Sequence, residues 1–190
     1  RMDGVMAVKY AVEKLKAKEI ILWGQSLGTG VAAQVAADLE TMDENGKMEF
    51  TTITSENSWV VQGLVLEAPY ISMPHAFGDF WMFRWPLFFL RRDQRVRLGS
   101  RMLTDTFHTK LWLNQSSVPV LFLHALDDGV IPHEHTDHLM EHITMPDSLK
   151  YRIYHHYKPE TGGHNHLPRA PKFGETLRQF AEACFAFPYR

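Results

Sequence analysis

The sequence predicts an α/β fold with a mostly parallel sheet and helices on both faces. Two observations predict this class. Short, continuous apolar runs of the kind found in buried parallel strands alternate with longer segments whose apolar residues recur at helical spacing. The expected order is helix, strand, helix, strand, insert, strand, helix, strand and helix. Successive strands are expected to lie parallel, because each connection returns the chain to the end of the sheet at which the previous strand began.

The N-terminal part of the chain supplies the first three elements. Residues 4–17 carry apolar side chains at helical spacing with lysines between them, which predicts a helix. Residues 20–23 form a short apolar run that ends at Gly24, which predicts a buried strand. Residues 29–39 are rich in alanine and valine and are expected to be helical, whereas residues 41–58 are polar and are interpreted as a long loop.

The C-terminal part continues the alternation. A second buried strand is expected at residues 60–68, where Pro69 stops it. An insert of about residues 71–115 follows. The remaining strands are expected at residues 118–124 and 149–155, and the remaining helices at residues 133–143 and 172–187.

The composition is that of a globular domain large enough to bury a substantial core. Of the 190 residues, 45% are hydrophobic and 22% are charged, as in ordinary globular proteins. The net charge of −2 gives no electrostatic basis for binding nucleic acid. Cys184 is the single cysteine, so no internal disulfide can form, and a buried thiol is favoured. No apolar run reaches the roughly 20 residues that span a bilayer.

A nucleophile motif of the form G-x-S-x-G follows the first expected strand. It reads Gly-Gln-Ser-Leu-Gly and lies between a predicted strand and a predicted helix, which is the context the motif requires. We expect Ser26 to have strained backbone geometry, at a turn so sharp that side chains at Gly24 and Gly28 would collide with neighbouring backbone. The following helix would point its first N–H groups at the site, and the N–H of Leu27 would donate to an oxyanion.

A serine nucleophile of this kind needs a base and an orienting acid, which follow it in the order acid, then histidine. The loop after the third strand contains two candidate acids, Asp127 and Asp128. Asp128 is favoured because residues 130–132 close the loop behind it. Glu67, at the end of the second strand, is a third candidate and is expected to be a structural hydrogen-bond partner.

The loop after the fourth strand contains two candidate bases. His164 directly follows a pair of glycines that allow the turn needed to carry an imidazole over the nucleophile. It is therefore favoured over His166. The expected catalytic residues are Ser26, Asp128 and His164.

Four other histidines lie close together in the sequence and could bind a metal, because several are three or four residues apart on one helix. They are His133, His135, His138 and His142. No cysteine or carboxylate completes a tight set, and no Gly-rich phosphate loop or Cys-x-x-Cys pair is present. The sequence therefore predicts no metal and no other cofactor.

Aromatic residues concentrate in residues 77–92, which contain seven phenylalanines and tryptophans followed by two arginines. We interpret the insert as a cap over the active site. Phe80, Trp81 and Trp85 would line the substrate pocket together with Gln25. Tryptophan beside arginine also suits the headgroup boundary of a membrane, so residues 77–92 are a candidate membrane-surface contact.

Four segments together resemble the α/β-hydrolase-domain serine lipases: WGQSLGTGVA, LVLEAPY, PVLFLHALDDGVIP and the Gly-Gly-His-Asn loop. The sequence is nearest to the branch of membrane-anchored lysophosphatidylserine and monoacylglycerol lipases. The resemblance implies an α/β-hydrolase fold, a triad of Ser26, Asp128 and His164, a lysophospholipid or monoacylglycerol substrate, and a location at the endoplasmic reticulum membrane. Gln25 departs from the histidine common in this family, which bears on specificity.

The resemblance also implies that residues 1–190 are the C-terminal part of a hydrolase domain. The family's fold has more strands than the four expected here. We expect the first strands, a membrane anchor and the second oxyanion donor to precede Arg1, so that residues 19–23 would be paired on one side only. A thioesterase and a serine peptidase remain alternatives because they share the triad chemistry, and so does a truncated product without activity.

Overall fold

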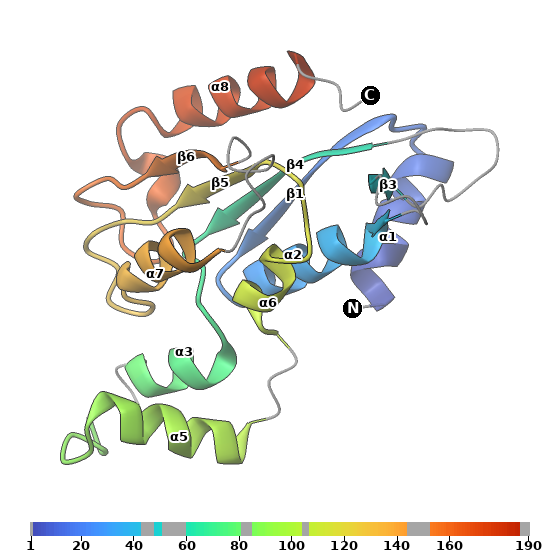
Figure 1. Ribbon diagram of the computed structural model, residues 1–190. Helices are drawn as coiled ribbons and strands as arrows, with labels where there is room; N and C mark the ends of the chain where they lie inside the picture. Colours follow the sequence, from blue (N-terminus) through green and yellow to red (C-terminus); the bar gives the residue numbers. More distant parts are fainter. Residues whose placement is uncertain are drawn as a thin grey trace.

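The computed structural model describes residues 2–42, 48–50, 60–80, 85–103, 107–143 and 153–186. Its centre is a four-stranded parallel sheet in the order β1-β4-β5-β6 (Figure 1). The strands are β1 (Glu19–Gln25), β4 (Val60–Glu67), β5 (Val120–Leu123) and β6 (Ile153–Tyr157). Each expected strand is present; residues 149–152, where the last strand was expected to begin, lie outside the described residues.

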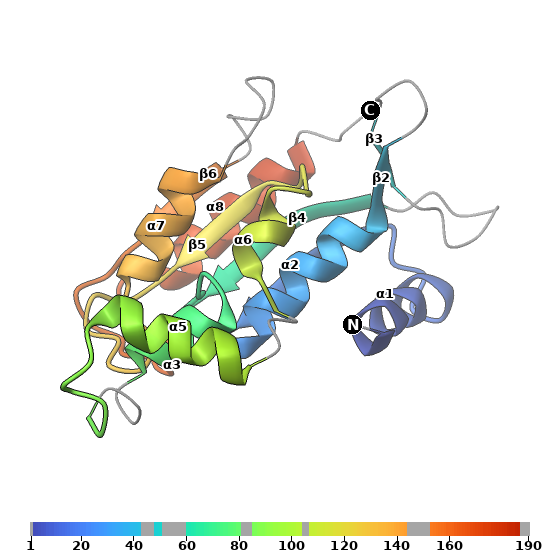
Figure 2. The same ribbon diagram turned by 60° about the horizontal axis from the view of Figure 1, so that its bottom comes forward.

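Helices cover both faces of the sheet, as predicted (Figures 1 and 2). One face carries α1 (Met2–Glu13), α2 (Leu27–Leu39), α6 (Thr109–Leu113) and α7 (Glu134–His142). The other face carries α8 (Phe173–Ala186), preceded by a short 3-10 turn η2 (Leu167–Arg169). Two further helices, α3 (Met73–Asp79) and α5 (Arg92–Met102), lie beyond the end of the sheet, in the insert interpreted as a cap (Figure 1). We call them the cap helices, and their place over the active site stays a prediction.

The core is divided between the two faces by the two-residue period of the strands. On β5, Val120 and Phe122 pack toward α1, α2 and α7, whereas Leu121 and Leu123 pack toward α8. All four side chains are buried, which explains why the strand has a continuous apolar run instead of an alternating pattern. Cys184 packs on the α8 side, and burial raises the pKa of its thiol to about 11. Cys184 is therefore the buried core thiol that the sequence favoured.

The edge of the sheet is β1. Within the described residues β1 pairs with β4 alone, in parallel register from Glu19 opposite Val60 to Gln25 opposite Glu67. The expectation of one-sided pairing for this strand is confirmed for the described part of the chain.

The polar stretch after α2 differs from the expected long loop. It contains an antiparallel pair formed by β2 (Glu40–Met42) and β3 (Met48–Phe50). The strands are short and are joined by five residues, a connection that the polar composition of the stretch did not distinguish from a long loop. Residues 43–47 and 51–59 lie outside the described residues.

The cap helices α3 and α5 are joined by polar contacts and by close packing. Arg92 makes a bidentate contact with Asp79, with Nε 2.9 Å from Oδ1 and Nη2 2.7 Å from Oδ2. The buried Arg95 donates to the carbonyl oxygens of Gly78 and Leu90, at 2.8 and 2.6 Å. A Cβ on Gly78 would lie 2.9 Å from Val96, so the small residue permits the close approach of the two helices. The insert is thus a defined unit of the fold.

No helix in the described ranges is both long and apolar enough to cross a bilayer.

A half-buried histidine on β6 provides a prediction about acid stability. Burial lowers the pKa of His156 from 6.5 to about 4, and its Nε2 has no hydrogen-bond partner among the described residues. The His156 side chain therefore binds a proton more readily in the unfolded chain than in the folded one. Protonation does not oppose folding above about pH 6.5, but it destabilises the folded state increasingly as the pH falls from 6.5 toward 4. We expect His156→Gln to reduce the loss in unfolding free energy between pH 7 and pH 4 by about 1–3 kcal/mol.

The measurement is urea unfolding across that pH range, and His155→Gln on the same strand is the matched control because His155 is exposed. An equal change in both variants would show that the partial burial of His156 is not the cause.

Candidate active site

The nucleophile position is built where β1 turns into α2. Ser26 has φ +50°, an uncommon value for a residue with a side chain, which confirms the expected backbone strain at this turn. The strain is held by hydrogen bonds on both sides of the residue. The Ser26 N–H donates to the carbonyl of Glu67 at 2.8 Å, and Thr29 donates to the Ser26 carbonyl from its N–H at 2.9 Å and its hydroxyl at 2.6 Å.

The two motif glycines have different surroundings. A Cβ on Gly24 would lie 2.3 Å from the Gly28 carbonyl oxygen and 2.8 Å from the Thr29 Cα, so only glycine fits there. A Cβ on Gly28 would meet no atom of the described residues within 4 Å. The expectation that both positions exclude a side chain is therefore correct for Gly24 and wrong for Gly28. The helix turns the Gly28 Cα outward, while Gly24 faces the first turn of α2.

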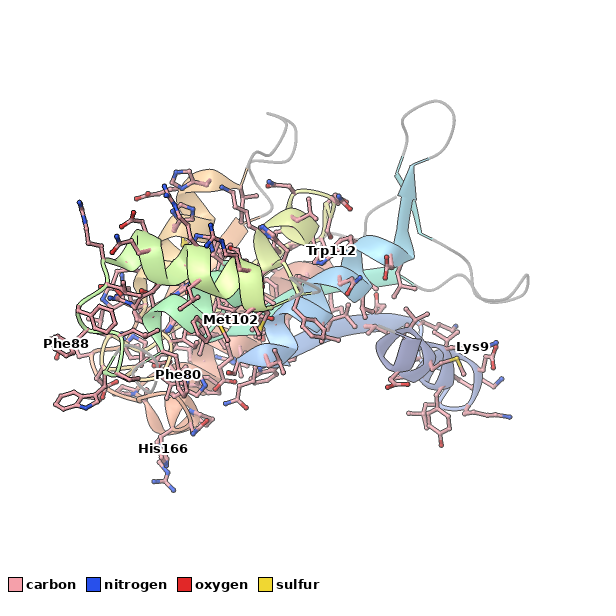
Figure 3. All side chains as sticks on the ribbon, turned by 90° about the horizontal axis from the view of Figure 1, so that it is seen from below. Lys9, Phe80, Phe88, Met102, Trp112 and His166 are labelled. Atoms are coloured by element: carbon pink, nitrogen blue, oxygen red, sulfur yellow. The ribbon has the colours of Figure 1, made fainter. Side chains whose placement is uncertain are left out.

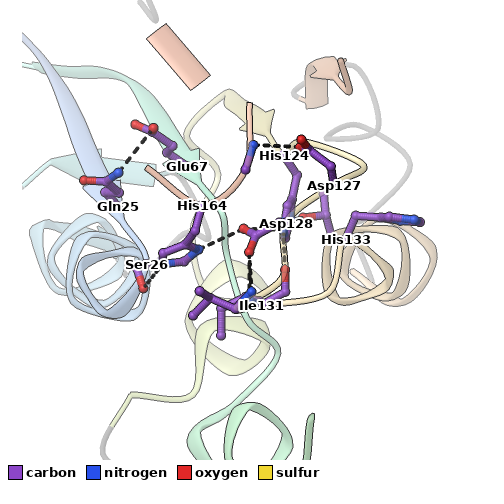
Figure 4. Close-up of polar contacts among 12 residues, drawn as sticks. Gln25, Ser26, Glu67, His124, Asp127, Asp128, Ile131, His133 and His164 are labelled. Carbon is purple, nitrogen blue, oxygen red and sulfur yellow. Dashed lines mark hydrogen bonds and ion pairs between the residues drawn. The ribbon is translucent and has the colours of Figure 1, made fainter. Parts of the chain in front are cut away.

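The candidate base lies directly over the nucleophile (Figure 4). His164 Nε2 is 2.9 Å from Ser26 Oγ, and His164 Nδ1 is 2.8 Å from Asp128 Oδ2. The loop reaches this position through Gly162 at φ +152° and Gly163 at φ +51°, values that side chains disfavour. The structure brings together the serine, acid and histidine that the sequence indicated, although His164 is 36 residues from Asp128 and 138 residues from Ser26 in the chain.

Asp128 is buried and fully engaged by hydrogen-bond donors. Its Oδ1 accepts from the N–H groups of Val130 and Ile131 at 2.8 and 3.0 Å, and its Oδ2 faces His164. Burial alone would raise the pKa of this carboxyl, but hydrogen bonds from His124, His164 and the Val130 N–H outweigh it and hold the pKa well below the usual range. Asp128 is therefore a carboxylate in the folded protein. The contact with His124 was not anticipated from the sequence.

The alternatives for acid and base have other positions. Asp127 is exposed, and its Oδ1 accepts a hydrogen bond from the Gly163 N–H at 2.7 Å, so it ties the acid loop to the histidine loop. His166 is exposed and lines an open cavity of about 380 Å³ with Arg169. Figure 3 shows the His166 side chain extending away from the body of the protein. Neither residue occupies the place filled by Asp128 or His164.

Glu67 has the structural role expected of it. The side chain is buried at the end of β4, where Oε2 accepts from Trp23 Nε1 at 3.1 Å and Oε1 from Gln25 Nε2 at 3.4 Å. Burial raises the pKa of Glu67, while the Trp23 hydrogen bond and the nearby His164 lower it to a smaller extent. Gln25 is exposed beside Ser26, consistent with a place at the mouth of the site (Figure 4).

The aromatic residues expected to line the substrate pocket differ in their exposure. Trp85 and Phe88 are 82% and 81% exposed, and Phe80 is half-buried. Trp81 lies outside the described residues. Phe80 and Phe88 lie at the same end of the molecule, far from α1 (Figure 3). Because Trp85 is largely exposed, it encloses no substrate in this structure, and its expected place in the lining of the substrate pocket stays a prediction. The concentration of rings alone could not show which side of the cap they occupy.

The four clustered histidines have separate surroundings. His133 Nδ1 lies 3.1 Å from Asp137 Oδ2, and the buried His135 accepts a hydrogen bond from the Ile71 N–H at 3.3 Å. His138 and His142 stack with their ring centroids 4.0 Å apart. In the described ranges, no three or more histidine, cysteine, aspartate or glutamate side chains converge as a metal site.

The parallel sheet, the helices on both faces and the strained serine between β1 and α2 define the α/β-hydrolase fold. Solved structures of this fold superpose over almost the whole chain. They include an esterase of Pyrococcus furiosus (TM-score 0.57, 13% identity, 97% of this chain and 59% of that one) and a puromycin hydrolase (TM-score 0.61, 16% identity, 97% and 25%). An acylaminoacyl peptidase of Pyrococcus horikoshii has a TM-score of 0.59 at 13% identity, over 93% and 26%.

Among curated proteins, the chain is similar to the human Protein ABHD12B, with 28% identity over 185 residues. The match covers 94% of this chain and 45% of the relative, so the chain spans less than half the length of that protein. No family model matches the chain.

Proposed function

We propose that the protein is a serine hydrolase that cleaves carboxylic esters through an acyl-enzyme on Ser26. The observation that carries this proposal is the continuous path of contacts from Ser26 Oγ through His164 to the buried Asp128 carboxylate, at 2.9 and 2.8 Å. This is the geometry of a nucleophile, its general base and the group that orients the base. It rests on atoms contributed by three separate loops at the carboxyl ends of the strands.

The residues have distinct roles in the proposed reaction. Ser26 Oγ attacks the ester carbonyl carbon while His164 Nε2 takes the hydroxyl proton, and the resulting tetrahedral oxyanion collapses to release the alcohol, which receives that proton. Water then attacks the acyl-enzyme by the same path, and the carboxylic acid leaves Ser26. Asp128 keeps the His164 proton on Nδ1 and stabilises the imidazolium. The Leu27 N–H at the start of α2 is one oxyanion donor.

We infer that the substrate is a lipid acyl ester, of the lysophospholipid or monoacylglycerol type. Support comes from the exposed rings of the cap and from the arginines that follow them. Arg91, Arg92 and Arg97 line an open cavity of about 590 Å³ together with His75, Asp93 and Val96, and Arg92 is also paired with Asp79. An acyl chain is compatible with apolar rings, and an anionic headgroup is compatible with arginine. The proposed place of action is the endoplasmic reticulum membrane.

Contact with a membrane surface is a testable part of this proposal. A double change of Trp85→Ala and Phe88→Ala should weaken binding to vesicles of phosphatidylcholine and phosphatidylserine by about 10-fold or more, because burying one large apolar side chain supplies roughly 1.5–3 kcal/mol. Cosedimentation measures this directly. Tyr10→Ala is the control because Tyr10 is 58% exposed on α1, in a part of the molecule distant from the cap (Figure 1). Equal weakening in both variants would contradict a specific contact through the cap.

The proposed reaction is tested by labelling the protein with a fluorophosphonate and locating the adduct by mass spectrometry. An adduct on Ser26 is expected. A panel of monoacylglycerol, lysophospholipid, acyl-thioester and peptide substrates then separates esterase from thioesterase and peptidase activity. Preference for the lipid esters supports the proposal, and preference for thioester or peptide replaces it with that alternative. If the folded chain neither labels nor turns over any of these substrates, the alternative of a truncated protein without activity is supported instead.

A further inference from the structure

A second histidine lies behind the candidate acid. His124 directly follows the last residue of β5, and its side chain is fully buried. Its Nε2 lies 2.9 Å from the Ile131 carbonyl oxygen and 3.3 Å from Asp128 Oδ2. Its Nδ1 lies 2.6 Å from the Thr136 hydroxyl on α7. No contact joins it to Ser26 among the interactions of the described residues, so any effect on the nucleophile must pass through Asp128.

The neighbours of His124 determine where its proton resides. The Ile131 carbonyl and the Asp128 carboxylate can only accept hydrogen bonds, so Nε2 must carry hydrogen. The Thr136 hydroxyl can donate to Nδ1, which leaves both ring nitrogens satisfied in the neutral imidazole. His124 is therefore held from both sides as a donor aimed at the acid and its loop.

This donor completes the set of contacts around Asp128. Oδ1 faces two backbone N–H groups, and Oδ2 is shared by His164 Nδ1 and His124 Nε2. A carboxylate with donors on both oxygens cannot rotate without breaking hydrogen bonds in a site that water does not reach. Without His124, the side of Oδ2 away from His164 would lose its donor, and the Ile131 carbonyl would lose one as well. The carboxylate could then turn away from the base.

We propose that His124 is a positioning residue that holds the Asp128 carboxylate in the orientation that His164 requires. This inference rests on the proposed function, because a fixed acid is useful only where His164 acts as a base. It assigns a role to the histidine of the His-Ala-Leu-Asp-Asp segment, four residues before the acid. The spacing alone could not reveal the role, because the contact depends on the turn of the acid loop back toward the end of β5.

The test replaces His124 by leucine and by glutamine in the otherwise unchanged chain. Leucine removes all three polar contacts of the ring, whereas glutamine can place an N–H donor near the position of Nε2. We expect kcat for ester hydrolysis to fall about 10-fold to 100-fold in His124→Leu with KM changed less than about 2-fold, because one hydrogen bond to a charged group is lost. His124→Gln should recover most of kcat. His155→Leu, at an exposed position on β6, is the control and should retain the parent kcat.

A second readout does not require turnover. The proton on His164 Nδ1, hydrogen-bonded to Asp128, should give the most downfield imidazole resonance in the proton NMR spectrum. In His124→Leu this resonance should broaden or move upfield, and in His124→Gln it should return toward its original position. If Ser26 proves unreactive, this spectrum still decides whether His124 holds the Asp128–His164 pair, so failure of the proposed function is distinguishable from failure of the positioning role.

A third variant keeps the proposal testable if His124→Leu does not fold. Thr136→Val removes the hydroxyl that fixes the far side of the ring and should change kcat and the His164 resonance in the same direction, by a smaller amount. Unchanged kcat and an unchanged resonance in folded His124→Leu would overturn the proposal. The proposal would also be overturned if every variant had a lowered thermal midpoint but kept the parent kcat and an unchanged His164 resonance. Such a result would mean that His124 has a purely structural role.

Discussion

Ser26→Ala is expected to lower ester hydrolysis at least about 10³-fold and to abolish labelling by a fluorophosphonate. The change removes the Oγ atom that contacts His164 at 2.9 Å and that would form the acyl bond. A methyl group at this position avoids any new clash, because alanine is smaller than serine and the φ of +50° strains both residues similarly. Turnover of p-nitrophenyl esters and gel-based labelling measure the two effects.

Two histidine variants show whether the loss is specific to the proposed path. His164→Ala should reduce turnover to a similar extent as Ser26→Ala, since residues that act as one unit are not additive. His166→Ala should leave most activity, because that side chain is exposed and it is His164, not His166, that contacts Ser26. The assignment of Ser26 is wrong if the alanine variant, at equal folded fraction, still labels at the parent rate. The assignment of the base is wrong if His166→Ala has the larger loss.

Gly24→Ala is expected to have the second large effect, on folding and on activity together. Its Cβ would lie 2.3 Å from the Gly28 carbonyl oxygen, 2.7 Å from the Gly28 carbonyl carbon and 2.8 Å from the Thr29 Cα. These are backbone atoms of the first turn of α2, which cannot rotate away as a side chain can. We expect a loss of about 3 kcal/mol or more in unfolding free energy, at the upper end of the usual cost of overpacking. Urea unfolding followed by circular dichroism gives this value.

Gly28→Ala is the matched control for that prediction. No atom of the described residues lies within 4 Å of a Cβ built there, and Gly28 belongs to α2. Alanine favours a helix over glycine by roughly 1 kcal/mol, so the variant should be as stable as the parent or slightly more stable. Similar destabilisation at both positions would show that the space around Gly28 is not open in solution. Activity of Gly28→Ala reports separately on whether substrate needs the space.

Much of this molecule could be predicted from local patterns. Short apolar runs and helical periodicity predicted the four parallel strands and the helices on both faces, because burial on two faces requires such runs. The G-x-S-x-G motif predicted the strained turn at Ser26, since only a glycine fits at Gly24. Chain order then indicated an acid after the third strand and a histidine after the fourth. These features depend on residues that are near one another in sequence.

Only the tertiary structure decided the features that depend on contacts between distant segments. The sequence favoured Asp128 over the adjacent Asp127, but their different surroundings come from the loop, which buries Asp128 beside His164 and leaves Asp127 exposed on the Gly163 N–H. The exposure of Trp85 likewise follows from how the insert packs and could not be inferred from the concentration of aromatic residues. The contact between His124 and Asp128 arises because the acid loop folds back over the end of β5. A pattern along the chain shows which face of an element is apolar, but the partner that each polar atom meets is set by how the elements pack in three dimensions.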